Sequence, residues 1–151
     1  MEWTITLNEE NQYAEIVTGG VADRDGSLEM AKEISKVLSK TKIKKLLIDH
    51  RNIRSVSGGI VEIYNRPKEF EKIGVIPGVK IAEVVRADHK TFFHFLETVC
   101  VNRGYKLLIF DDKKSALKWL LVNRSPVTMS PEVSRSFGFP PERTNFPARA
   151  S

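Results

Sequence analysis

The residues best able to do chemistry gather in one short polar stretch in the first half of the chain. It follows an apolar run at 46–48 and contains a histidine, two arginines, two serines and a glycine pair: His50, Arg51, Arg54, Ser55, Ser57, Gly58 and Gly59. Apolar residues at helical spacing resume after the glycines, so a turn is expected here between a buried strand and a helix. Backbone N–H groups point outward at a helix start, and hydroxyls and cations beside them favour an anionic ligand.

Ser57 has two interpretations at this position. As a phosphoacceptor, it would place the phosphate at a helix N-terminus near Arg51 and Arg54, where the helix dipole favours negative charge. Alternatively, its hydroxyl simply caps the helix, which is a common role of serine. The sequence leaves both interpretations open.

Asp49 and His50 suggest acid–base chemistry, but the residues around them do not complete a catalytic site. A carboxylate that closes a buried strand commonly accepts N–H groups of the following loop, and the spacing places no second catalytic group beside His50. The segment 55–59, Ser-Val-Ser-Gly-Gly, also lacks the Gly-x-Ser-x-Gly pattern of a nucleophile elbow. We therefore expect no enzymatic activity, and an enzyme that uses His50 or Ser57 is only a distant alternative.

The histidines and the cysteine do not indicate metal binding. His89 and His94 are five residues apart, which is off the spacing of three or four that aligns side chains on one helical face. Together with Cys100, the only cysteine, they form no pattern of metal ligands. No metal and no cofactor are expected.

The composition is typical of a soluble globular domain. The 151 residues are 41% hydrophobic and 28% charged, and no apolar run approaches the roughly 18 residues of a membrane span. A single cysteine and the absence of a signal-peptide pattern predict a cytoplasmic protein. The net charge of +5 is spread out, apart from the cluster at 40–45, and no nucleic-acid recognition module is present. No specific nucleic-acid partner is expected.

Strand and helix patterns alternate along the chain. Strands are expected at 3–8, 12–18, 45–49, 79–85 and 107–110, the second ending at the glycine pair 19–20. Helices are expected to start at 23–27, 58–59, 87–88 and 111–112. Strands joined by helices run parallel, so we predict an α/β fold: a mixed, mostly parallel five-stranded sheet with four main helices and an N-terminal β-hairpin.

Several details of the helices also follow from the pattern. Pro67 should kink or split the second helix, and Asp88 should cap the third. The apolar residues of the second helix at nearly helical spacing are Ile60, Ile63, Tyr64, Phe70 and Ile73. The inward stripe of the third is Phe92, Phe95, Leu96 and Val99, with Phe93 off it. These phenylalanines are either ordinary core or the wall of an apolar ligand pocket.

Binding sites of such sheets lie beyond the carboxyl ends of the strands, and the end of the fourth strand adds Arg86 and His89 to the candidate binding residues.

After residue 123 the pattern changes, because five of the seven prolines fall in Pro126–Pro147. The domain is therefore expected to span 1–123, and 124–151 to form an extended or disordered tail. Three phenylalanines in this tail could dock on the domain or on a partner: Phe137, Phe139 and Phe146.

Three short motifs follow one another along the chain: Val17-Thr18-Gly19, LLIDHRNI at Leu46–Ile53 leading to Ser57-Gly58, and FDDKKSALKWL at Phe110–Leu120. In this order they resemble the STAS family of anti-sigma-factor antagonist domains. The resemblance covers Trp3–Leu121 and points to the bacterial STAS-like group that is also compared with CRAL-TRIO lipid-binding domains. In regulatory STAS domains a partner kinase phosphorylates the serine of an Asp-Ser-Ser-Gly-like segment. Ser57-Gly58 lies at the matching place, but the preceding acidic position is not matched.

The resemblance implies a non-enzymatic regulatory or protein-interaction domain with a STAS-like fold. Its surface would be centred on residues 50–59 with 86–89 alongside, and it would bind an anionic group or an acidic partner surface at the helix start. The alternative is a carrier or sensor of a small apolar or lipid-like ligand, held beneath the helices 60–73 and 89–103. STAS resemblance also permits a homodimer.

Overall fold

The computed structural model describes residues 1–75 and 78–122. The chain divides into two units, Met1–Leu121 and Val122–Ser151, and the first unit contains every helix and strand described below. The extended or disordered tail expected at 124–151, with its three phenylalanines, lies outside the described residues.

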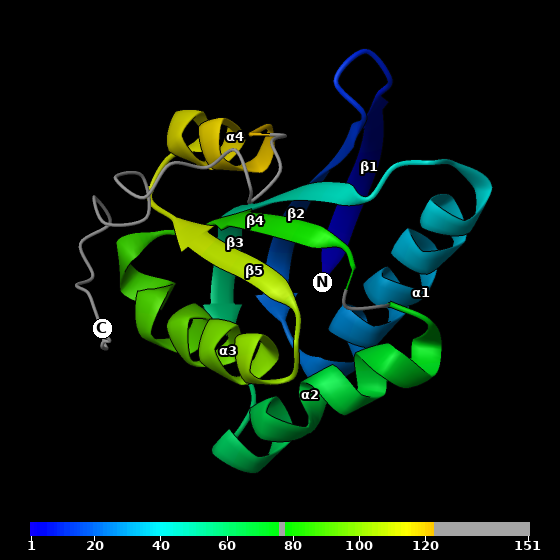
Figure 1. Cartoon of the computed structure of the whole chain (residues 1–151). Coiled ribbons are helices and arrows are strands. Elements are labelled where there is room, and N and C mark those ends of the chain that lie inside the picture. Colours follow the sequence, from blue (N-terminus) through cyan, green and yellow to red (C-terminus); the bar gives the residue numbers. More distant parts are fainter. Residues whose placement is uncertain (76–77, 123–151) are drawn as a thin grey trace, which may run out of the picture. The chain divides into compact units, whose positions relative to one another are not determined.

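Five strands form one mixed sheet (Figure 1), as the strand pattern predicts. They lie side by side in sequence order: β1 (Glu2–Asn8), β2 (Tyr13–Ala22), β3 (Lys45–Val56), β4 (Lys80–Val84) and β5 (Lys106–Phe110). The β1–β2 pair is antiparallel and forms the N-terminal hairpin, whereas the other neighbouring pairs are parallel. The predicted α/β fold is confirmed.

Four α-helices connect or follow the strands, with a short 3₁₀ turn before the third. They are α1 (Arg24–Lys40), α2 (Ile60–Ile73), η1 (Ala87–His89), α3 (Lys90–Asn102) and α4 (Lys113–Leu120). Two begin where an aspartate caps them: Asp23 Oδ1 accepts from Gly26 N–H, and Asp112 Oδ1 from Ser115 N–H, each at 2.7 Å. The predicted starts of α1 and α4 therefore follow from local capping chemistry.

Two strands are longer than the sequence pattern predicts. Strand β2 does not end at its glycine pair but continues to Ala22, and β3 continues past Asp49 to Val56. The two extensions pair with each other, from Gly19 opposite Asn52 to Ala22 opposite Val56. Register shifts on either side of the glycines, with Gly20 at φ +80°, accommodate the irregularity. The predicted turn at 50–56 is therefore a strand.

The helices differ from the expectations in three places. Asp88 does not cap α3, because both its carboxylate oxygens accept hydrogen bonds from Arg86 and the helix begins only after η1. Phe93, placed off the inward stripe by the sequence, is buried, whereas Phe92 and Phe95 are only partly buried. Helix α2 runs unbroken across Pro67, so it is not split.

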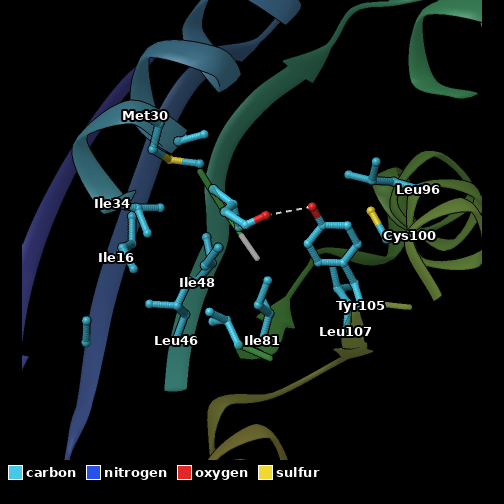
Figure 2. Close-up of a cluster of buried hydrophobic side chains, with 14 of the residues drawn as sticks. Ile16, Met30, Ile34, Leu46, Ile48, Ile81, Leu96, Cys100, Tyr105 and Leu107 are labelled. Atoms are coloured by element: carbon cyan, nitrogen blue, oxygen red, sulfur yellow. Dashed lines mark hydrogen bonds between the residues drawn. The ribbon is translucent and has the colours of Figure 1, made fainter. Parts of the chain in front are cut away.

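The strands alternate between two faces of the sheet. Leu46, Ile48 and Ile81 face the larger core, which α1, α2 and α3 cover, and Figure 2 shows these side chains between Met30 of α1 and the residues of α3 and β5. The Tyr105 hydroxyl, in the same cluster, donates to the Val75 carbonyl at 2.8 Å. The opposite face packs against α4 and forms a smaller core: Tyr13, Leu47, Ala82, Val84, Ala116 and Leu120.

Within 1–75 and 78–122, none of the helices has the length and hydropathy that a bilayer span requires.

Candidate functional site

The extension of β3 separates residues that the sequence pattern placed in one turn. Successive side chains of a strand point to opposite faces of the sheet. His50 therefore lies on the α1–α3 face, where it stacks on Phe93. Arg51 lies on the α4 face with Asp49, whose pKa responds to the charge of Lys113 on α4. These residues do not form a single cluster at the start of α2.

Asp49 holds Arg51 in a bidentate pair. Nε and Nη2 of Arg51 donate to the two carboxylate oxygens at 2.9 and 2.8 Å, and its backbone N–H donates to Oδ1 at 3.1 Å. Burial raises the pKa of Asp49, but the hydrogen bonds and charge of Arg51 outweigh burial, so the pKa lies below its ordinary value. Asp49 has the structural role that the sequence allowed, and the guanidinium edge of Arg51 is already occupied.

Arg54 and Ser55 lie on the exposed final part of β3. Ser55 pairs in register with Val21 of β2. Arg54 lines a groove over the β1–β3 side of the sheet together with Glu2, Trp3, Gly20 and Asn52. Both residues therefore lie on β3, before the turn that leads to α2.

The start of α2 is open to solvent. Ser57, Gly58 and Gly59 are exposed, and a Cβ at Gly59 would meet nothing within 4 Å. The N-cap residue is Gly59, which has no side chain to cap the helix, so the capping role considered for Ser57 is wrong. The Ser57 backbone N–H donates to the Ala22 carbonyl at 2.8 Å and fixes the turn to β2. The Glu62 carboxylate lies close to Gly58, since a Cβ at Gly58 would clash with its Oε1. Glu62 therefore places negative charge beside the helix start.

Arg86 lies beside the end of β3, as expected from the sheet topology. Its Nη1 donates to the Ile53 carbonyl at 3.4 Å, while Nε and Nη2 donate to Asp88 at 3.0 and 2.6 Å. The hydrogen bonds from Arg86 lower the pKa of Asp88 and outweigh desolvation, which raises it. His89 is buried, and its Nδ1 has no hydrogen-bond partner among the described residues.

An exposed apolar patch follows the glycines and was missed by the sequence pattern. Ile60 is 73% exposed, Val61 72% and Tyr64 60%. Only Ile63 of the expected apolar stripe near the helix start is buried. The sequence did contain a signal for this patch: the apolar residues of 60–73 cover more of the helix surface than one core can bury. We call Ile60, Val61 and Tyr64 the α2 patch.

A cavity of about 70 Å³ lies between the sheet and helices α1, α2 and α3. Its lining is mostly apolar, with Met30, Ile34, Ile48 and Leu96 among the residues that Figure 2 labels. Three buried polar side chains also line it: His50, Arg66 and Glu83.

Two of these side chains, His50 and Glu83, form a partial network on the cavity wall. His50 Nδ1 is 2.8 Å from the Thr18 hydroxyl, and its Nε2 is 3.7 Å from Glu83 Oε2. Arg66 and Glu83 were not among the residues predicted from the sequence, although a glutamate inside the apolar strand 81–85 was a visible signal.

No group of His, Cys, Asp and Glu side chains within 1–75 and 78–122 could hold a metal ion. Cys100 is buried beside the cavity-lining residues, and burial, with the charge of Glu83, raises the pKa of its thiol to about 12. His94 is an exposed helix residue whose Nδ1 lies 3.0 Å from Glu97 Oε1.

No protein-family model and no curated protein sequence matches the chain. Solved structures do match. A DUF3478-family protein from Shewanella loihica, with a SpoIIAA-like fold, is 18% identical over 79% of this chain and 92% of its own, with a TM-score of 0.51. An anti-sigma factor antagonist from Mycobacterium paratuberculosis is 14% identical over 79% and 94%, with a TM-score of 0.51.

The likeness to these structures establishes the fold. The chain has a SpoIIAA-like, STAS-type α/β fold, which is the fold that the sequence motifs predicted.

Proposed function

We propose that the protein is a non-enzymatic regulatory domain that binds another protein through the start of α2. The observation that carries this proposal is the α2 patch, in which three large apolar side chains are exposed next to one another and directly follow an uncapped helix start. Single exposed apolar residues are ordinary, but an apolar patch rimmed by polar groups is typical of an interaction site. The fold, shared with an anti-sigma factor antagonist, is consistent with this role.

The polar rim of the surface sets the chemistry of the partner. Free N–H groups at the helix start favour a hydrogen-bond acceptor or an acidic side chain on the partner. Ser57 lies at this rim, exposed and without a capping role. A phosphate on Ser57 would add negative charge near Glu62, so phosphorylation is expected to weaken the binding of an acidic partner.

The α2 patch can be tested by site-specific photocrosslinking in cells. A photoreactive residue in place of Tyr64 should capture a protein that the same residue in place of Val101, an exposed apolar position on α3, does not capture. Binding of the captured protein, measured with purified components, should weaken by about tenfold or more in Val61→Glu. Val101→Glu, the matched control, should leave it unchanged.

The same assay decides the role of Ser57 and the kind of partner. Ser57→Asp should weaken binding of the captured protein, and unchanged binding would overturn the phosphoswitch. Equal effects of Val61→Glu and Val101→Glu would overturn the proposed surface. A Tyr64 crosslink to a second copy of this chain would identify the α2 patch as a homodimer interface instead.

A second candidate function is favoured by a separate observation. The cavity beneath α1, α2 and α3 lies where the sequence alternative placed a ligand, under the helices 60–73 and 89–103. A mostly apolar cavity with a few polar side chains is the usual form of a small-molecule site. We therefore also propose a carrier or sensor of a small, largely apolar molecule.

A further inference from the structure

The two outer strands of the sheet differ in how their free edges are covered. The strand order is β1-β2-β3-β4-β5, so β1 and β5 each have a neighbouring strand on one side only. The free edge of such a strand presents N–H and C=O groups that can pair with another chain. On β5 a side chain of α3 occupies this edge, because the Ile109 N–H donates to Oε2 of the buried Glu97 at 3.0 Å. The edge of β5 is therefore protected.

The edge of β1 has no such cover. Among the described residues, no side chain bonds to the backbone of 2–8, and the indole of Trp3 bonds instead to the carboxylate of Glu33. The pairing of β1 with β2 runs over seven residues without a register shift, so no bulge turns the strand away. The strand also contains no lysine and no proline, which commonly discourage edge pairing. A regular, open edge of this length is suited to pairing with another strand.

The side chains of β1 set what that other strand must look like. Trp3 and Ile5 are partly buried against the larger core, and Leu7, on the same face, is 38% exposed. Three exposed polar side chains lie on the opposite face: Glu2, Thr4 and Thr6. Residues directly opposite each other in an antiparallel pair share a face of the sheet. A matching strand therefore alternates apolar and polar residues in the same way.

The apolar face of β1 is complementary to itself when two copies run antiparallel. If Ile5 lies opposite Ile5 of a second copy, Trp3 of each copy lies opposite Leu7 of the other. This pairing covers the exposed part of Leu7 with an aromatic side chain. A shift by one residue would place apolar side chains opposite polar ones. A parallel pair related by a two-fold axis would turn the two apolar faces to opposite sides of the sheet.

The polar face is complementary in the same register. Thr4 of each copy lies opposite Thr6 of the other, and threonine pairs are favourable across strands. Glu2, the only charged residue of the strand, lies opposite Asn8, so no like charges meet. The register that matches the apolar faces therefore carries no electrostatic penalty.

We propose that the protein forms a symmetric dimer in which the β1 strands of two copies pair antiparallel, with the two-fold axis at Ile5. The two five-stranded sheets then form one continuous sheet. The contact uses none of the residues of the α2 patch, so the inference goes beyond the proposed function and does not depend on it. The same strand edge is used twice, so the assembly closes as a dimer. The contact area of one strand pair is small, and we expect a dissociation constant on the order of micromolar.

Sedimentation velocity of the full chain over a concentration series from about 1 to 300 μM measures this association. The sedimentation coefficient should rise from that of a monomer to that of a dimer. A monomer at every concentration would overturn the proposal, and so would growth beyond a dimer, because a closed two-fold contact does not extend.

Charged residues on the exposed polar face test the strand and its register. In Thr4→Lys/Thr6→Lys each lysine lies opposite a lysine of the other copy, so the association should weaken about tenfold or more. Thr4→Glu/Thr6→Glu should weaken it in the same way. An equimolar mixture of the two variants should associate again, because each lysine then lies opposite a glutamate. If the mixture associates no more tightly than either variant alone, the register is wrong.

Two control variants separate this interface from other surfaces. Leu108→Lys changes a residue of β5 that is as exposed as Leu7, and it should leave the dimer unchanged, since the edge of β5 is protected. Val61→Glu in the α2 patch should also leave it unchanged, whatever it does to partner binding. A dimer that is lost in either control but retained in Thr4→Lys/Thr6→Lys would place the contact on β5 or on α2, against the proposal.

Discussion

The two faces of the sheet are built from the same strands, yet they are packed in different ways. On the α4 face, Leu47 and Ala82 of the sheet meet Ala116 and Leu120 of the helix, and none of the four is exposed at all. On the α1–α3 face, the larger core surrounds a cavity with buried polar side chains on its wall. Close packing stabilises a fold, whereas space and unpaired polar groups reduce stability and are typical of binding sites. The contrast places the candidate ligand site on the α1–α3 face.

Truncation of large side chains should show this contrast most strongly. Leu120→Ala on the α4 face is expected to lower the free energy of unfolding by about 3–4 kcal/mol, because a closely packed side chain leaves a new cavity. Met30→Ala, which enlarges an existing cavity on the other face, should lower it by about 2 kcal/mol. Urea denaturation of both variants measures the difference. Equal losses would show that the two faces are packed equally well.

Replacing a helical alanine with a larger residue tests the same contrast by filling space instead of creating it. Ala116→Leu on α4 is expected to destabilise by about 2–3 kcal/mol, because Ala116 is fully buried in the smaller core. Ala31→Leu should cost less than about 1 kcal/mol, since Ala31 borders the cavity. Thermal and urea unfolding of the pair provide the measurement. A greater loss in Ala31→Leu would contradict an open cavity.

Much of the fold could be predicted because its signals are local. Asp23 and Asp112 start their helices through hydrogen bonds to residues three positions away. The buried strands and the parallel connections followed from apolar runs and from the alternation of strand and helix. Gly19-Gly20 resembled a strand end, but pairing with the extension of β3 carries β2 through it. A long-range pairing of this kind leaves no local signal in either segment.

The candidate site was less predictable, because its composition depends on packing. His50 and Arg51 are neighbours in sequence, and only the continuation of β3 places them on opposite faces. Arg66 is buried because α1 and α3 both pack on α2, which no property of an arginine indicates. The exposure of the α2 patch also depends on packing, because its side chains lie on a side of α2 that remains uncovered.

The Asp49–Arg51 pair gives the smallest effect. Its guanidinium edge is filled, whereas Nε and Nη2 of the buried Arg66 have no hydrogen-bond partner among the described residues. Arg51 is about half exposed, so water screens the pair, and Asp49→Asn should cost about 1 kcal/mol at neutral pH. The pKa of Asp49 is lowered in the folded state, so its stabilisation is present above the unfolded-state value of 3.8 and is lost as the pH falls through the folded-state value.

The difference between wild type and Asp49→Asn should therefore shrink as the pH is lowered below 3.8, which urea denaturation across a pH series measures. Asp88→Asn is the control, since that pair is exposed and contributes little. A difference that stays constant from neutral to acidic pH would show that Asp49 acts through packing alone.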